Sequence, residues 1–218
     1  EFEQFGVTVL QGYGITECGP LVSVNRNEAN RLDSVGLISA NCEVKLDNGE
    51  ILVRGKNLMT GYYNHPEMTE EVMRDGWFCT GDLGEIDKDG FLYIKGRIKR
   101  MITPYNGHKI FPAQVEGIIG RHDAVKSCAV VGVKDFDHVQ GEWPVAYVEL
   151  KEGASANAET VVEELKAMYV AELDDLARPV NTVVIDEMPR EGMGKIAYKK
   201  LSEKYNAEEE AKRAQMVS

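Results

Sequence analysis

The pentapeptide YGITE (13–17) carries three kinds of side chain that a nucleotide site needs. An aromatic ring can stack on a base, a hydroxyl can bind phosphate, and a carboxylate offers the oxygen ligands that Mg²⁺ prefers. Tyr13, Thr16 and Glu17 supply these groups in that order. Taken alone, the pentapeptide is equally consistent with an ordinary polar turn.

A second group comprises Asp82, at the end of the sequence GWFCTGD (76–82), and Arg97. An aspartate beside a glycine on a loop can accept hydrogen bonds from both ribose hydroxyls, as an acidic residue does in dinucleotide-binding folds. The planar fork of donors on Arg97 could reach ribose or phosphate from the other side. Singly, such residues are more often a turn aspartate and a surface cation, so the pair gains weight only together with other motifs.

The third group is MPREGMGK (188–195), where two glycines and a proline predict a shaped, exposed loop that ends in Lys195. We expect Lys195 to project from the end of this loop at the start of a helix. A loop lysine is usually a solvated charge, but on a mobile loop it can enter an active site as a cation.

Neither of the two common nucleotide motifs is complete. The dinucleotide fingerprint GxGxxG, which would begin at residue 12, has Glu17 in place of its third glycine. A P-loop that ends at Lys195 would need Gly and Ser/Thr where the chain has Pro189 and Ile196. Any nucleotide site must therefore be built differently.

The elements that would position these residues begin with a small, mostly antiparallel β subdomain. Residues 6–10 are apolar and β-branched, which predicts a buried strand that ends in the glycine-rich turn 11–14. Two alternating runs flank the hairpin turn DNG (47–49). A short helix is predicted over residues 66–74, and further strands over 77–94.

After Gly96, helical and strand patterns alternate, which predicts a compact α/β domain. Helices are expected over residues 112–120 and 158–176 and after Lys195, and strands over 124–133, 144–150 and 180–185. Apolar residues in the long helix recur at three-to-four spacing, namely Val161, Val162, Leu165, Met168, Tyr169 and Leu173. We predict an α+β fold with a β-rich part over residues 1–96 and the α/β domain over 97–218.

The composition is that of a globular protein, with 43% hydrophobic and 28% charged residues among 218. Its 25 basic and 36 acidic side chains give a net charge of −11, which argues against nucleic acid as a partner. No apolar run is long enough to span a membrane, and the four cysteines form no CxxC pair. We expect reduced thiols and a cytoplasmic location. Because the sequence opens with Glu1 inside strand-like residues, we also expect a longer parent polypeptide.

In this order and at these separations, the motifs YGITE, GWFCTGD, GRIKRMI and PREGMGK resemble the adenylate-forming superfamily. That superfamily includes acyl-CoA synthetases, aryl-CoA ligases, firefly-type luciferases and the adenylation domains of peptide synthetases. The stretch RGKNLMTGYYNHPE (54–67) is similar to acyl- and aryl-CoA ligases. The resemblance covers nearly the whole chain.

The resemblance implies a ligase that uses ATP and Mg²⁺ to convert a carboxylic acid into an acyl-adenylate. The thiol of coenzyme A then displaces AMP. The implied nucleotide-binding residues are Tyr13, Gly14, Asp82, Ile94 and Arg97, with Tyr13 stacked on adenine, Asp82 on the ribose and Ile94 near the base. The implied catalytic residues are Thr16 on phosphate, Glu17 on Mg²⁺ and Lys195 between the substrate carboxylate and the α-phosphate.

The resemblance also places a hinge at Lys99, about which the C-terminal domain would rotate between the two half-reactions. The face presented after rotation would carry Gly107, past which a pantetheine arm could move closely, and Lys109, a cation near phosphate. Three features depart from the usual pattern. The loop over residues 103–108 is one residue longer, Met193 replaces a small polar residue, and Tyr198 stands where a basic residue is common.

The superfamily's phosphate loop and most of its acyl pocket lie upstream of these motifs and are absent from the sequence. We therefore expect the chain to be inactive by itself. The leading interpretation is a ligase of the fatty-acyl type with ATP, CoA and a carboxylic acid as its partners. The alternatives are an acyl-AMP ligase or adenylation domain that loads a carrier protein, and a non-catalytic binding module.

Overall fold

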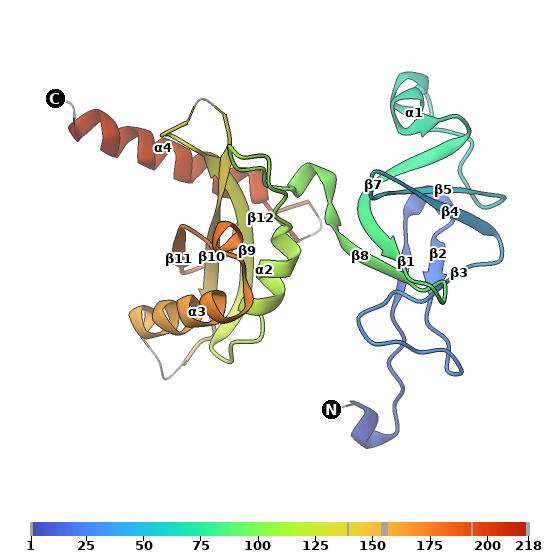
Figure 1. Cartoon of the computed structure of the whole chain (residues 1–218), viewed down its shortest axis with the longest axis horizontal. Helices are drawn as coiled ribbons and strands as arrows, with labels where there is room; N and C mark the ends of the chain where they lie inside the picture. The colour runs from blue at the N-terminus through green and yellow to red at the C-terminus, as the bar shows by residue number, and fades with distance from the viewer. Residues whose placement is uncertain (1, 139, 154–156, 193, 217–218) are drawn as a thin grey trace. The chain divides into compact units, whose positions relative to one another are not determined.

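The computed structural model describes residues 2–138, 140–153, 157–192 and 194–216, and the structural statements below refer to these residues. Backbone contacts divide the chain into two compact units, Glu1–Lys99 and Arg100–Ser218, which are described separately (Figure 1). From the sequence we expect the domain boundary after Gly96. The division comes three residues later because strand β8 (Leu92–Arg97) pairs with the first unit's sheet through Arg97.

Two antiparallel sheets form the first unit. The smaller has the order β1-β2-β3 (Gly12–Gly14, Leu21–Val24 and Leu37–Ile38). The larger has the order β4-β5-β7-β6 (Cys42–Asp47, Glu50–Gly55, Trp77–Ile86 and Met73–Arg74), with β8 also paired to β7. The predicted hairpin is confirmed, since Asn48 and Gly49 both have positive φ, as a two-residue type I′ turn requires.

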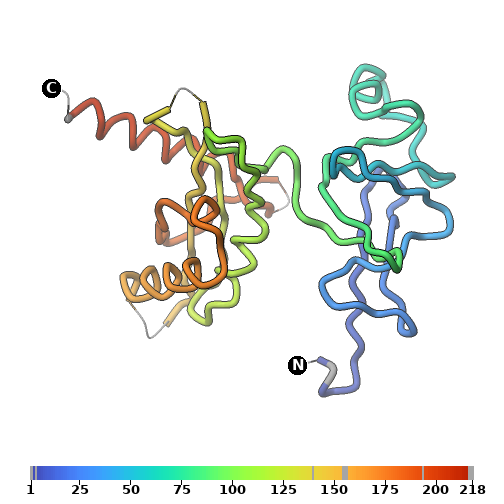
Figure 2. Tube along the Cα trace, viewed as in Figure 1, coloured from blue at the N-terminus to red at the C-terminus, as the bar shows by residue number. Residues whose placement is uncertain are grey.

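The core of the first unit joins both sheets. Its buried members are Cys18, Val22, Cys42, Ile51, Val53 and Leu92. The predicted short helix is α1 (Pro66–Val72), which ends two residues earlier than expected because Met73 and Arg74 pair with β7. Figure 2 traces the long connections of this unit, residues 25–36 between β2 and β3 and residues 56–65 between β5 and α1.

Residues 6–10 do not form the predicted buried strand. Val7 and Val9 are 51% and 52% exposed, and no strand in the described part of the chain pairs with them. An apolar, β-branched run becomes a strand only where a neighbouring strand completes its hydrogen bonds. The predicted turn at residues 11–14 is also wrong, because Gly12–Gly14 is strand β1, paired with β2.

The second unit is built on the mixed sheet β11-β10-β9 (Asn181–Ile185, Glu142–Leu150 and Val125–Lys134). Helices α2 (Pro112–Ile119) and α3 (Ala158–Glu172) cover one face, and α4 (Tyr198–Met216) lies on the other (Figure 1). Both faces are thus buried, which explains the almost continuous apolar sequence of β10. Ala146 and Val148 face α2 and α3, whereas Val145 and Tyr147 face α4. The α+β fold predicted from the sequence is confirmed.

Helix α3 is shorter than the predicted helix over 158–176. It begins where the Asn157 side chain accepts a hydrogen bond from Thr160 N (2.8 Å), a standard N-cap. It ends at Glu172 because Leu173 adopts an extended conformation and is buried. A 3₁₀ turn, Asp175–Ala177, follows.

Glu149 is a carboxylate buried in β10, with its side chain only 4% exposed. It accepts hydrogen bonds from Lys126 Nζ (2.6 Å) and Met188 N (3.2 Å), and so ties the segment before Lys195 to the sheet. The hydrogen bond from Lys126 holds the pKa of Glu149 below its ordinary value. A carboxylate with a lowered folded pKa stabilises the fold above its unfolded pKa, and this contribution disappears as pH falls through the folded value.

We predict that Glu149→Gln lowers the free energy of unfolding at pH 7 by about 1 kcal/mol, because the charged partner of Lys126 is lost. The difference should begin to shrink below about pH 4.3, the ordinary pKa of a glutamate, and should go on shrinking as pH falls through the lower folded value. Urea denaturation of both proteins at pH 7 and at about pH 3.5 measures this change. Equal destabilisation at the two pH values would contradict a contribution from the charge.

Candidate functional site

The carboxylate of Asp82 joins three strands of the first unit. Tyr13 Oη on β1 donates a hydrogen bond to Asp82 Oδ2 (2.5 Å), and Arg97 Nε on β8 lies 2.8 Å from Asp82 Oδ1. Asp82 is 3% exposed, whereas the side chain of Arg97 is 62% exposed. The structure therefore brings together three of the residues predicted to bind a nucleotide.

The local sequence of β7 fixes the direction of this carboxylate. Asp82 N donates to Thr80 Oγ1 (3.0 Å), and Thr80 Oγ1 donates to Ile51 O (2.7 Å) on the neighbouring strand. Gly81 has a φ of 70°, which a residue with a Cβ rarely adopts. A buried carboxylate is costly unless its oxygens are hydrogen-bonded, and here both oxygens have partners.

Three residues of the predicted nucleotide site and its neighbourhood are half-buried on the core of the first unit. Tyr13, Ile15 and Ile94 pack against the core of the first unit. Ile94 is on β8, opposite Gly84 of β7. Burial is the main cause that raises the pKa of the Tyr13 phenol above its ordinary value, and the hydrogen bond to Asp82 adds to it. Tyr13 is therefore a neutral hydrogen-bond donor at physiological pH.

The remaining YGITE residues lead into a 3₁₀ turn, Thr16–Cys18. Gly14 is required here because a Cβ on it would lie 2.2 Å from Pro20 O. Thr16 is exposed, and Glu17 is partly exposed. Glu17 Oε1 accepts a hydrogen bond from Tyr62 Oη (2.8 Å). Nothing in the sequence distinguishes Tyr62 from the neighbouring tyrosine, so this contact could not be found from local patterns.

Glu17 is compatible with Mg²⁺ only as one ligand among several. The described residues contain no group of three or more His, Cys, Asp or Glu side chains that could hold a metal by themselves. Mg²⁺ is usually bound through one or two carboxylates together with phosphate oxygens and water. A single carboxylate next to the exposed hydroxyl of Thr16 fits that mode of binding.

Lys195 lies in the second unit, on a short hairpin instead of at the predicted helix start. It belongs to β13 (Lys195–Ile196), which pairs with β12 (Arg190–Glu191), and α4 begins only at Tyr198. Gly192 and Gly194 have φ values of 54° and 85°, and these conformations reverse the chain into the hairpin. Lys195 is exposed. Met193, which departs from the family pattern, lies outside the described residues.

The loop over residues 103–108, which carries Gly107, is attached to the connection between β9 and β10. The ring of Tyr105 stacks on His138, with centroids 3.9 Å apart and planes inclined by 3°. His138 Nδ1 lies 2.7 Å from Asp135 Oδ2, a nearly fully buried carboxylate. Gly107 is exposed with a φ of 77°, and nothing lies within 4 Å of the position that a Cβ would take. The loop therefore leaves open space beside this glycine.

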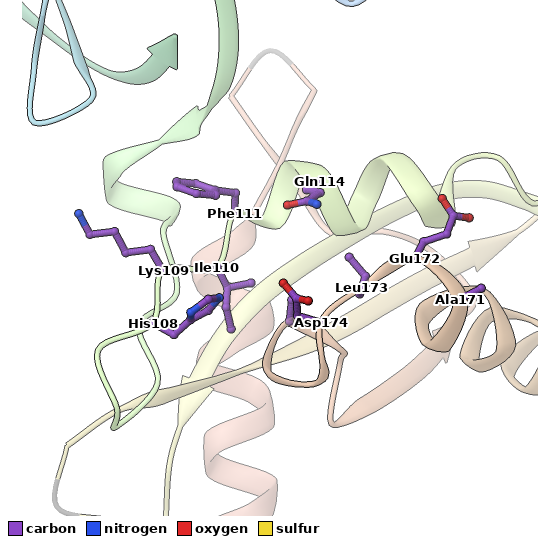
Figure 3. A pocket seen from close by; sticks show the side chains of 10 residues that line it. His108, Lys109, Ile110, Phe111, Gln114, Ala171, Glu172, Leu173 and Asp174 are labelled. Carbon is purple, nitrogen blue, oxygen red and sulfur yellow. The ribbon is translucent and has the colours of Figure 1, made fainter.

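Lys109 borders a cavity of about 280 Å³ that also contacts Gln114, Glu172 and Asp174. Figure 3 shows the amine of Lys109 directed away from the two carboxylates. Glu172 Oε2 is paired with Arg121, at 2.5 Å. The cavity itself is therefore mixed in charge, and Lys109 offers its cation to the solvent outside it.

The comparisons with known proteins find matches in both units. Residues 1–63 match the family described as AMP-binding enzyme, and residues 114–195 match the AMP-binding enzyme C-terminal domain. The chain is 36% identical over 204 residues to a feruloyl-CoA synthase from Amycolatopsis sp, with 88% of the chain and 40% of that protein covered. It is 34% identical over 211 residues to a long-chain-fatty-acid–CoA ligase from Bacillus subtilis (strain 168), with 91% and 36% covered.

Among solved structures, O-succinylbenzoate coenzyme A synthetase from Bacillus subtilis, in complex with ATP and magnesium ion, is similar with a TM-score of 0.79. The identity is 32%, and the match covers 91% of the chain and 42% of that structure. The chain spans about 40% of the length of the curated feruloyl-CoA synthase. A search of the described helices finds none that combines the length and apolar character needed to cross a membrane.

The burial of Tyr13 and its hydrogen bond to Asp82 predict that its phenol loses its proton at a higher pH than an ordinary tyrosine. We expect its phenol not to ionise with the ordinary tyrosines near pH 10, because burial and Asp82 oppose the phenolate. Asp82→Asn should lower the pKa of Tyr13 only partway towards the ordinary value, since burial remains. The measurement is the absorbance of phenolate near 295 nm from about pH 9 to 11.5, with Tyr13→Phe as the reference and circular dichroism as the check on folding. Loss of an ordinary titrating phenol in Tyr13→Phe would contradict this description of the site.

Proposed function

The chain belongs to the AMP-binding, adenylate-forming superfamily of enzymes, and from this premise we propose that it is the C-terminal portion of an ATP-dependent carboxylate–CoA ligase. The observation that carries the proposal is the buried Asp82, held between Tyr13 and Arg97. The names of the relatives support the reaction class, since they are CoA ligases or synthases.

For the acid substrate, the proposal extends only to its class, a carboxylic acid. The relatives are named for feruloyl, 2-succinylbenzoate and long-chain fatty acid substrates, which differ in size and aromaticity. A long-chain fatty acid remains the first acid to test, with ferulate and 2-succinylbenzoate beside it. Coenzyme A is the proposed acceptor, because a thiol can displace AMP from an acyl-adenylate, whereas a free carboxylate is a poor electrophile.

Asp82 is suited to the ribose of ATP because its oxygens are not saturated. A carboxylate offers about four lone-pair sites, and Tyr13 and Arg97 occupy one on each oxygen. The two ribose hydroxyls can donate to the remaining sites. We propose that the Tyr13 ring and Ile94 contact adenine and that Gly14 lets the backbone approach the nucleotide.

The turn after β1 supplies the groups for the phosphates. We propose that Thr16 donates its hydroxyl to a phosphate oxygen and that Glu17 is the protein ligand of Mg²⁺. When bound, Mg²⁺ neutralises charge on the phosphates and polarises the α-phosphate for attack. Glu17 and Thr16 would act by placing that charge, without themselves exchanging protons.

We propose that the backbone around Lys99 is the hinge between the two half-reactions. Arg97, two residues before it, is fixed to Asp82 in the first unit. Arg100, the next residue, is bonded to Glu116 and stacks over the ring of Tyr198 at 3.7 Å in the second unit. A rotation would therefore be absorbed by the torsions around residues 98 and 99, which lie in a short 3₁₀ turn, Ile98–Arg100, and Lys99 is exposed.

Each half-reaction would then use a different part of the second unit. In adenylation, the ammonium of Lys195 would contact the attacking carboxylate and the α-phosphate, and stabilise the charge that develops between them. In thioester formation, the open space at Gly107 would admit the pantetheine arm, with Lys109 near the CoA phosphates. The exposure of all three residues supports this assignment.

The test is the effect of Lys195→Ala on each half-reaction in the intact ligase. Adenylation, measured as carboxylate-dependent ATP–diphosphate exchange, should fall by about 10²–10³, the usual effect of removing one electrostatic contact to the transition state. Thioester formation from supplied acyl-AMP should change little. Lys199→Ala is the matched control, since Lys199 is a highly exposed lysine on the adjoining helix. Equal loss of both steps would contradict the proposed role of Lys195, and absence of exchange in the wild type would contradict the ligase itself.

A further inference from the structure

The hydroxyl of Tyr62 donates a hydrogen bond to Glu17 Oε1, at 2.8 Å. We propose that Tyr62 is a positioning residue that orients the Glu17 carboxylate towards a nucleotide-bound divalent cation. This inference rests on the proposed function, because it assumes that Glu17 faces Mg²⁺–ATP. Tyr62 itself would contact neither the metal nor the nucleotide.

The connection that carries Tyr62 donates hydrogen bonds to main-chain oxygens of the Thr16–Cys18 turn, one from a backbone N–H and one from a side-chain amide. Met59 N donates to Glu17 O (2.7 Å), and Asn57 Nδ2 donates to Cys18 O (2.5 Å). The backbone of the turn is therefore fixed independently of Tyr62. What remains to be fixed is the Glu17 side chain, which has several rotatable bonds and loses considerable entropy when it is held in one orientation.

The backbone of Tyr62 is hydrogen-bonded to a side chain of helix α1. Tyr62 N donates to Thr69 Oγ1 (2.9 Å), and Thr69 Oγ1 donates to His65 O (3.2 Å). Gly61 has a φ of 152°, and a Cβ on it would lie only 3.1 Å from Thr69 Oγ1. The close approach of helix and connection at this glycine places the Tyr62 ring. A continuous series of contacts thus runs from α1 through Tyr62 to the Glu17 carboxylate.

The chemistry of the donor favours a role towards a cation. A phenol fixes one carboxylate oxygen without neutralising the negative charge, whereas a lysine or arginine would form an ion pair that competes with a metal. Glu17 Oε2 receives no hydrogen bond from any side chain or backbone group in the described ranges. This oxygen is available to a ligand.

Hydrogen-bond partners of this kind tune metal sites strongly, and their loss typically costs 10–100-fold in metal affinity or activity. Tyr62→Phe keeps the ring and removes only the donor. We expect it to weaken the binding of Mn²⁺ to the complex of the intact ligase with a non-hydrolysable ATP analogue by about tenfold. Free Mn²⁺ is measured by electron paramagnetic resonance. Tyr63→Phe is the matched control, because Tyr63 is the next residue and is 89% exposed.

Two further measurements separate positioning from a general structural role. The adenylation rate of Tyr62→Phe should return towards the wild-type value at saturating Mg²⁺, with an unchanged melting temperature. In a Glu17→Gln background, Tyr62→Phe should cause no additional loss of Mn²⁺ affinity, since the carboxylate that it orients is gone.

The outcomes are distinct. Wild-type affinity for Mn²⁺ in Tyr62→Phe, or the same loss with and without Glu17, would overturn the positioning role. If the wild-type ligase binds neither the ATP analogue nor Mn²⁺ with it, the proposed function fails before Tyr62 is tested. A tenfold loss that requires Glu17 and is absent in Tyr63→Phe would establish the proposal.

Discussion

One buried carboxylate, whose two oxygens both have hydrogen-bond partners, connects the sheets of the first unit. Asp82 is 3% exposed, and its carboxylate is stabilised there by a phenol and a guanidinium, while its backbone N–H donates to Thr80. These partners come from β1, β7 and β8, so the bonds to Asp82 connect the smaller sheet to the larger one. The same bonds leave lone pairs for the hydroxyls of a ribose. One constraint therefore serves both the fold and the proposed nucleotide site.

In the second unit, the residues of the proposed site lie singly on exposed connections. Its sheet is covered on both faces, and Glu149 anchors the segment that precedes the Lys195 hairpin. The stack of Tyr105 on His138 holds the loop that carries Gly107 in a similar way. A sheet covered on both faces, with exposed connections, suits a unit that would offer different groups to different steps of the proposed reaction. In that proposal, the ion pairs of the two arginines on either side of Lys99 would confine the movement to a few backbone torsions.

Local patterns in the sequence predicted the hairpin at Asn48-Gly49, the four helices and the main strands β4, β5 and β7 to β11, because turn chemistry and periodicity act over a few residues. They gave no signal for β2 and β3 of the smaller sheet. They failed for residues 6–10, with which no strand among the described residues pairs, and for Lys195, which lies on a hairpin next to two glycines in left-handed conformations. The order of the motifs indicated the family and pointed to Asp82 and Arg97. The bond from Tyr62 to Glu17 spans 45 positions. Contacts at that separation depend on how the sheets pack, which no local pattern encodes.

The proposed nucleotide site depends on Asp82 as the acceptor for a ribose diol. Calorimetric titration of the intact ligase with AMP and with 2′,3′-dideoxy-AMP isolates this contact, since the two nucleotides differ only in the hydroxyls that Asp82 would bind. We expect the wild type to prefer AMP by about tenfold or more, as for hydrogen bonds to a charged group, and Asp82→Asn to lose most of this preference. Equal affinities in the wild type, or a preference that survives in Asp82→Asn, would contradict this role of Asp82.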